Sequence, residues 1–129
     1  GPVVADGRTI WFRGWVDARS VLADGTPEPR GFQLHTTGMK MVRNTDTGEI
    51  VQVFALAGAD LSWRGIEVDA DELSLDLSRQ LCTVLDRNGA ARIWLPSGFY
   101  GVCSQAQFNY LTFEARAWHS RIVAERTPR

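Results

Sequence analysis

The chain has 129 residues, with 14 basic and 15 acidic side chains and a formal net charge of -1. This balance gives no bulk attraction to nucleic acid or to an anionic membrane, and no apolar run reaches the roughly 18 residues of a membrane-spanning helix. We therefore expect one globular domain, large enough to fold without a disulfide, a structural metal or a cofactor.

The chain begins with Gly1-Pro2, a pair that a protease typically leaves when an affinity tag is removed, so we assign the domain to residues 3–129. An Asp6-Gly7 turn then precedes a predicted strand that ends at Val16. Alternation places Ile10 and Phe12 on one face of this strand and Trp11, Arg13 and Trp15 on the other.

Residues 17–22 fit either a short helix or a further strand, and residues 23–30, with two prolines, predict a surface loop. A hairpin is predicted next, with its turn between Asn44 and Gly48, where the glycine suits a positive φ. The return strand, 50–56, is apolar on both faces, which indicates a central strand or one that lines an apolar interior.

The stretch around Leu73, Leu75 and Leu77 alternates with polar residues, which favours a strand. A helix over 70–87 is the alternative, because an Asp69/Glu72 pair resembles a capping box. The same choice arises over residues 105–124, where helical and alternating apolar patterns overlap. We favour a strand over 70–87, since Leu75 and Cys82 fall on the wrong side of the helical wheel. We favour strands over 105–124 as well.

Two tight-turn signals, Asn88-Gly89 and Ser97-Gly98, predict a three-strand meander over 79–103. Two-residue loops would pair Val84 with Ile93 and Tyr100 with Leu95, and would place Trp94 over Gly101. One face of the meander would then hold the apolar residues Cys82, Val84, Ala91, Ile93, Leu95, Tyr100 and Val102. The fold class expected from all these segments is mainly β, an antiparallel β-sandwich or an open β-jelly-roll; the alternative is α+β with the two helices.

The segment from Gly65 to Asp76 and the segment from Leu85 to Ile93 resemble the repeat of the OstA-like lipopolysaccharide-transport proteins. A second copy is similar, from Gly101 to Trp118, although Leu75 stands where an aromatic residue would be usual. The resemblance implies an open jelly roll of two stacked antiparallel sheets, whose apolar slot carries acyl chains in the periplasm or cell envelope. Exposed sheet edges would then suit self-association or a protein partner.

The main functional hypothesis is therefore a non-catalytic binding or scaffolding module that carries a lipid or another amphiphile. The groove residues it predicts are Ile50, Phe54, Leu73, Leu75, Val84, Ile93 and Leu95.

A second hypothesis is a protein- or nucleic-acid-interaction module that uses tryptophan and arginine side chains. Arginine and tryptophan alternate at i, i+2 spacing, which places them side by side on a strand face for stacking on a ligand or for internal cation–π packing. The surface residues it predicts are Trp11, Arg13, Trp15, Arg92, Trp94, Arg116 and Trp118.

A small hydrolase is the third hypothesis, and it would need His35 or His119 beside Cys103 or a carboxylate. No catalytic residue is assigned, because the sequence has no nucleophile motif near either histidine. No metal site is assigned either, because the spacing of the cysteines and histidines matches no zinc motif. Cys82 and Cys103 are expected to be free thiols.

Overall fold

A computed structural model describes residues 3–5 and 7–125, and the regular elements among these residues are all β-strands. Their bounds are β1 Val3–Ala5, β2 Thr9–Arg19, β3 Gln33–Arg43, β4 Ile50–Ala55, β5 Ala59–Trp63, β6 Ile66–Ala70, β7 Glu72–Asp76, β8 Leu81–Leu85, β9 Ala91–Trp94, β10 Phe99–Cys103, β11 Gln105–Asn109, β12 Ala115–Trp118 and β13 Arg121–Glu125. The mainly β fold class is confirmed. Residues 1–2, the expected tag remnant, lie outside the described residues.

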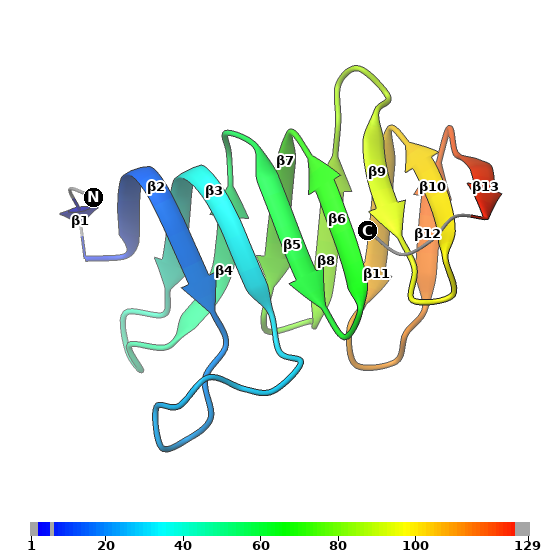
Figure 1. Ribbon diagram of the computed structural model, residues 1–129. Helices are drawn as coiled ribbons and strands as arrows, with labels where there is room; N and C mark the ends of the chain where they lie inside the picture. Colours follow the sequence, from blue (N-terminus) through cyan, green and yellow to red (C-terminus); the bar gives the residue numbers. More distant parts are fainter. Residues whose placement is uncertain (1–2, 6, 126–129) are drawn as a thin grey trace.

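The strands form one continuous antiparallel sheet that folds back on itself into two leaves (Figure 1). The back leaf runs β1-β2-β3-β4-β7-β8-β11-β12, and the front leaf runs β2-β3-β5-β6-β9-β10-β13. The long strands β2 and β3 belong to both leaves: Met39 to Arg43 pair with β4, and Gln33 to Thr36 pair with β5. The arrangement is an open jelly roll, as the resemblance implied.

The two leaves are joined along one edge, which we call the closed edge. The register of β2 shifts between Arg13 and Val16, where Gly14 has a φ of +83° that a residue with a side chain rarely adopts. This bulge lets β2 turn from one leaf into the other. The later connections between the leaves cross at the same edge. Backbone hydrogen bonds join them to one another: Thr37 N to Ala57 O (3.3 Å), Gly58 N to Asp71 O (2.9 Å) and Asp86 N to Ser104 O (2.8 Å).

Side chains alternate along each strand, so every leaf has an inner face that meets the other leaf and an outer face that meets solvent. Neighbouring strands bring the inner residues into rows. One row of the back leaf is Phe12, Met39, Ala55, Leu73, Val84, Ala106 and Ala117. The facing row of the front leaf is Ala18, Leu34, Leu61, Val68, Ile93, Gly101 and Ile122.

Several local predictions are confirmed. Leu73 and Leu75 are buried on strand β7, so the helix alternative over 70–87 is wrong, and strands β11, β12 and β13 likewise replace the helix near 105–124. Strand β2 extends to Arg19, so residues 17–19 form a strand and not the short helix that was the other possibility. The 44–48 turn closes with a hydrogen bond from Gly48 N to Asn44 O (2.7 Å) at a φ of +76°.

The predicted meander is wrong, because Asn88-Gly89 is not a hairpin turn. Strand β8 pairs with β7 and β11 in the back leaf, whereas β9 pairs with β6 and β10 in the front leaf. The connection crosses between the leaves and is shaped by Asp86, whose Oδ1 accepts the backbone N–H groups of Asn88 (3.0 Å) and Ala90 (3.3 Å). The turn signal was correct, but the strands that it joins do not pair.

The second turn shifts the register by one residue. Gly98 N donates to Leu95 O (3.0 Å), and Tyr100 pairs with Trp94, so the loop has three residues, with Gly98 in the left-handed region. Tyr100 and Val102 therefore lie on the outer face rather than in the core. Trp94 stacks on Tyr100 (5.0 Å between ring centroids) and does not cover Gly101, which pairs with Ile93.

Asp86 offers a test of how the leaves are connected. Replacing it with alanine leaves the N–H groups of Asn88 and Ala90 without their acceptor, so we expect the free energy of unfolding to fall by about 1–3 kcal/mol. Denaturant unfolding of Asp86→Ala and Asp86→Asn would measure this. The asparagine variant keeps an acceptor oxygen and should lose much less; equal losses in both variants would contradict the role of that oxygen.

Candidate functional site

The two leaves are packed together unevenly along their length. Around β5 the inner side chains fill the interior, and Leu61 is only 1% exposed. Toward β13 apolar side chains reach solvent instead: Leu95 is 41% exposed and Ile122 is 72% exposed. The interior therefore changes from a filled core near β5 to an open slot near β12 and β13.

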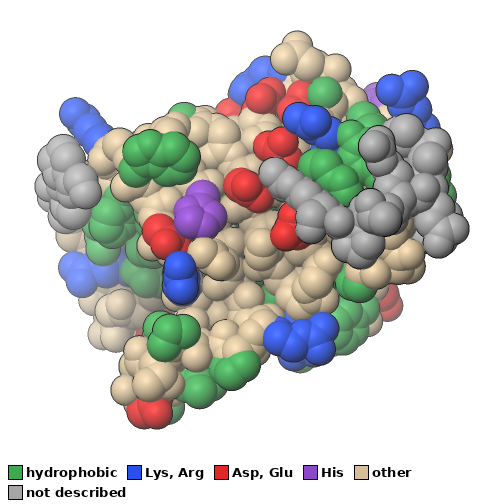
Figure 2. Space-filling model, viewed as in Figure 1, with side chains coloured by type: hydrophobic (Ala, Val, Ile, Leu, Met, Phe, Trp, Pro, Cys, Tyr) green, Lys and Arg blue, Asp and Glu red, His purple; other side chains and the backbone are tan. Residues whose placement is uncertain are grey.

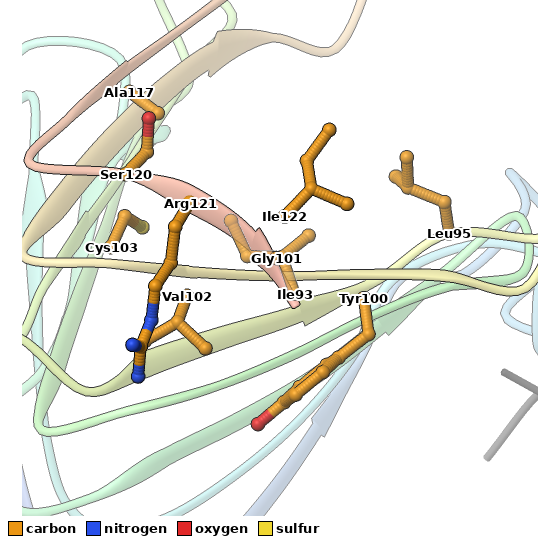
Figure 3. A pocket seen from close by; sticks show the side chains of 10 residues that line it. All are labelled: Ile93, Leu95, Tyr100, Gly101, Val102, Cys103, Ala117, Ser120, Arg121 and Ile122. Carbon is orange, nitrogen blue, oxygen red and sulfur yellow. The ribbon is translucent and has the colours of Figure 1, made fainter. Parts of the chain in front are cut away.

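Two cavities occupy this open part, with volumes of ≈ 450 Å³ and ≈ 380 Å³. Ile93, Leu95 and Ala117 line both of them, so we treat the pair as one groove, called the C-terminal groove. The first cavity is lined by Ile93, Leu95, Tyr100, Gly101, Val102, Cys103, Ala117, Ser120, Arg121 and Ile122 (Figure 3). The second is lined by Trp63, Ile66, Ile93, Leu95, Ala106, Gln107, Phe108, Phe113, Ala115, Arg116 and Ala117.

Small side chains explain why the leaves stay apart here. In the inner row of the back leaf, the large side chains of Leu73 and Val84 are followed on the next two strands by the small side chains of Ala106 and Ala117. In the front leaf, the inner position between Ile93 and Ile122 is Gly101, which adds no side chain at all. Alanine and glycine on facing strands cannot fill the space that leucine and valine fill elsewhere, and a groove results.

The groove surface is chemically suited to hydrocarbon. Arg116 and Arg121 are the charged residues among its lining, and no carboxylate belongs to either lining set. Figure 3 shows Leu95 and Ile122 pointing to one side of the ribbon, whereas Arg121 and Tyr100 point to the other. The outer face of the front leaf is different in kind, because acidic side chains gather over it (Figure 2).

An aromatic cluster stands at the inner end of the groove. Trp63, the last residue of β5, stacks on Phe32, which immediately precedes β3, at 5.4 Å and on Phe108 of the back leaf at 5.9 Å between ring centroids. Tyr110 and Phe113, from the turn between β11 and β12, also contact the Trp63 ring, at 6.3 Å and 5.6 Å. The cluster therefore connects the two leaves across the interior.

The predicted groove residues are distributed over three environments. Leu73, Leu75 and Val84 are buried in the filled part of the interior, and Ile50 packs against that core. Phe54 lies on the outer face, where the Lys40 ammonium sits 4.5 Å from its ring centroid, because its neighbours Val53 and Ala55 point inward. Only Ile93 and Leu95 of the predicted set line the C-terminal groove.

The sequence reasoning missed most of the groove lining. Ala117, Ile122 and Trp63 are ordinary strand residues with no turn signal or motif that marks them. The signal that could have found the groove is the run of small residues Gly101, Ala106 and Ala117 at paired inner positions of β10 to β12.

The predicted tryptophan and arginine residues do not form one surface. Trp11 contacts Lys40 on the outer face of the back leaf (5.2 Å), and Arg13 pairs with Gly38 nearby. Trp15, 76% exposed, stands at the closed edge, where β2 bends. Arg92 lies over Trp94 (5.9 Å) on the outer front leaf. The remaining pair is Arg116 and Trp118, both exposed on β12.

Both cysteines are free and buried, and they lie in different leaves. Burial raises the pKa of the Cys82 thiol, and burial together with the nearby Asp86 carboxylate raises the pKa of Cys103. Cys103 also lines the groove. His119 Nδ1 lies 2.9 Å from the Ser104 hydroxyl, and His35 Nε2 lies 3.0 Å from the Gln33 amide. Among the described residues, no group of three or more metal-ligating side chains forms a metal site.

The raised pKa of Cys82 makes stability depend on pH. The folded protein keeps the thiol proton at pH values where the unfolded chain loses it, so the free energy of unfolding should fall as the pH rises above the unfolded pKa of about 8.5. We expect a loss of about 1.4 kcal/mol from this thiol at about pH 9.5. Urea unfolding of the wild type and Cys82→Ala at several pH values would measure it; parallel pH profiles would show that Cys82 does not contribute.

Comparison with known proteins identifies the fold. No protein-family model matches the chain, and no curated protein sequence matches it. Among solved structures, it is similar to LptH from Pseudomonas aeruginosa, described as the LptA homologous periplasmic component of the conserved lipopolysaccharide transport device. The TM-score is 0.67 at 12% identity, over 99% of this chain and 90% of LptH. The resemblance to lipopolysaccharide-transport jelly rolls is therefore confirmed for the fold.

Proposed function

We propose that this domain is a non-catalytic module that carries a lipid or another amphiphile by holding its acyl chains in the C-terminal groove. The observation that carries the proposal is the exposure of Leu95 and Ile122 beside two apolar cavities that share lining residues, whereas inner residues around β5 such as Leu61 are buried. Exposed apolar surface in a concave site of this size is typical of a binding site.

The fold supports the same conclusion by analogy. LptH, which shares the jelly roll, is a periplasmic component of a lipopolysaccharide transport device. By this analogy we propose that the domain works in the periplasm or cell envelope, and we expect its ligand to be a lipid-like amphiphile. Fold alone does not determine function. The apolar groove is the reason to expect binding of an acyl chain, and the analogy with LptH only narrows the class of ligand.

The strand edges suggest how the domain would meet a partner. In the described pairing, β1 joins only β2, β12 joins only β11, and β13 joins only β10, so backbone groups of these strands face outward at the two ends. Such edges accept a further strand from another chain. We include in the proposal that a protein partner, or a second copy of this chain, adds to one of these edges.

Binding of a simple acyl ligand tests the proposal. We expect the purified domain to bind a fluorescent fatty acid and to release it when laurate is added, because each buried methylene contributes about 0.8 kcal/mol. A dodecyl chain with a neutral head should compete as well, whereas an oligonucleotide and an oligosaccharide should not.

The same assay separates the groove from the tryptophan surfaces. Trp11 and Trp118 lie on outer faces and line neither cavity, so replacing both with alanine should leave fatty-acid affinity within about twofold. No acyl binding by the wild type, or loss of binding in this double variant, would contradict the proposal.

A further inference from the structure

We infer that Trp63 closes the inner end of the groove and thereby limits the length of acyl chain that the domain can hold. The inference rests on the proposed function, because it names the residue that would set specificity at the same site. Trp63 is 6% exposed, lines the second cavity and contacts rings from both leaves.

The rings around Trp63 stand where the groove meets the filled part of the interior. The Trp63 indole lies nearly parallel to the rings of Phe32 and Phe108, at interplanar angles of 8° and 18°. The next inner position on the same strand is Leu61, which is 1% exposed and belongs to the filled core. An acyl chain that enters from the β13 end would therefore stop against the indole.

The strand order limits the length of the groove. From β6, whose Ile66 pairs with Trp63, the front leaf continues through β9 and β10 to β13. Three strand spacings amount to about 14 Å. A groove of this length holds part of a long acyl chain, so the remainder of a palmitoyl chain would stay in solvent while a shorter chain would be covered.

Phe113 forms the outer part of the same barrier. Its ring stacks on Trp63 at 5.6 Å, the Arg64 guanidinium lies 5.9 Å from its centroid, and it is nevertheless 60% exposed. The Phe113 backbone has a φ of +66°, a conformation that is unusual for a bulky residue and recurs at ligand clamps. Because Phe113 is so exposed, its ring can be removed with little effect on the core.

A series of fatty acids tests the inference. For the wild type, affinity should rise from octanoate to laurate and then level off at palmitate. In Trp63→Ala the space of the indole extends the groove, and the ratio of palmitate to laurate affinity should rise at least about tenfold, the factor that two further buried methylenes contribute. Phe113→Ala should shift the ratio in the same direction, and Phe54→Ala, an aromatic truncation on the outer face, should not.

The outcomes separate this inference from the proposed function. If the wild type binds no fatty acid, the proposed function fails. If the wild type binds but its chain-length profile is unchanged in both Trp63→Ala and Phe113→Ala, the groove carries acyl chains and Trp63 does not limit them. Should Trp63→Ala fail to fold, an unchanged profile in Phe113→Ala overturns the inference by itself.

Discussion

Replacing Ala117 with tryptophan is expected to lower the affinity for laurate at least tenfold while the domain stays folded. Ala117 lines both cavities from the edge strand β12, and its side chain is exposed, so an indole there would occupy the groove without entering the filled core. A ligand excluded from the groove loses the burial of several methylenes, each worth about 0.8 kcal/mol. Displacement of a fluorescent fatty acid would measure the loss.

The neighbouring residue on the same strand supplies the control. Trp118 lies on the outer face, because alternation along β12 places Ala117 inward beside Ala106. Trp118→Ala should therefore keep the affinity of the wild type. An Ala117→Trp variant that is folded by circular dichroism and binds laurate as tightly as the wild type would show that the ligand lies elsewhere.

Replacing Leu61 with alanine is expected to cost about 2–5 kcal/mol of unfolding free energy. Leu61 is 1% exposed and packs in the filled part of the interior, where a cavity cannot collapse easily. A loss of this size is a large share of the total stability of an ordinary domain. Denaturant unfolding would measure it, with affinity for laurate determined at a temperature where the variant remains folded.

Two further variants give losses of unfolding free energy with which the loss in Leu61→Ala can be compared. Leu61→Met conserves volume and should lose less than about 1.5 kcal/mol. Leu95→Ala removes a leucine that is already 41% exposed, so it should cost little stability and reduce laurate binding instead. If Leu61→Ala and Leu95→Ala had the same effect on stability, the division between a filled core and an open groove would be wrong.

Alternation of apolar and polar residues was enough to predict the fold class. The run around Leu73 and Leu75 places both side chains inward on β7, as a strand reading requires. Turn chemistry was less informative, because Asn88-Gly89 marks a turn without saying whether the flanking strands pair. The Asp86 carboxylate stabilises a connection that crosses between the leaves, so the strands on either side of the turn do not pair. A hydrophobic pattern does not reveal a hydrogen bond of this kind.

The position of the groove could not be read from single strands. It depends on which inner residues face each other across the two leaves, and that follows from the order of strands in each leaf. Ala106 and Ala117 look unremarkable in the sequence, yet next to Gly101 in the opposite leaf they leave the interior open. Phe54 was expected in the groove because both faces of its strand are apolar. Which of these faces points inward follows only from the pairing of β4 with β3 and β7.

The most direct test is nuclear Overhauser contact between the chain protons of bound laurate and the methyl groups of the protein. We expect contacts to Ile93, Leu95 and Ala117 in the groove, and none to Val53 and Leu75 in the filled core. Contacts to outer-face residues alone, or to the core methyl groups with none in the groove, would contradict a groove that holds acyl chains between β9 and β12.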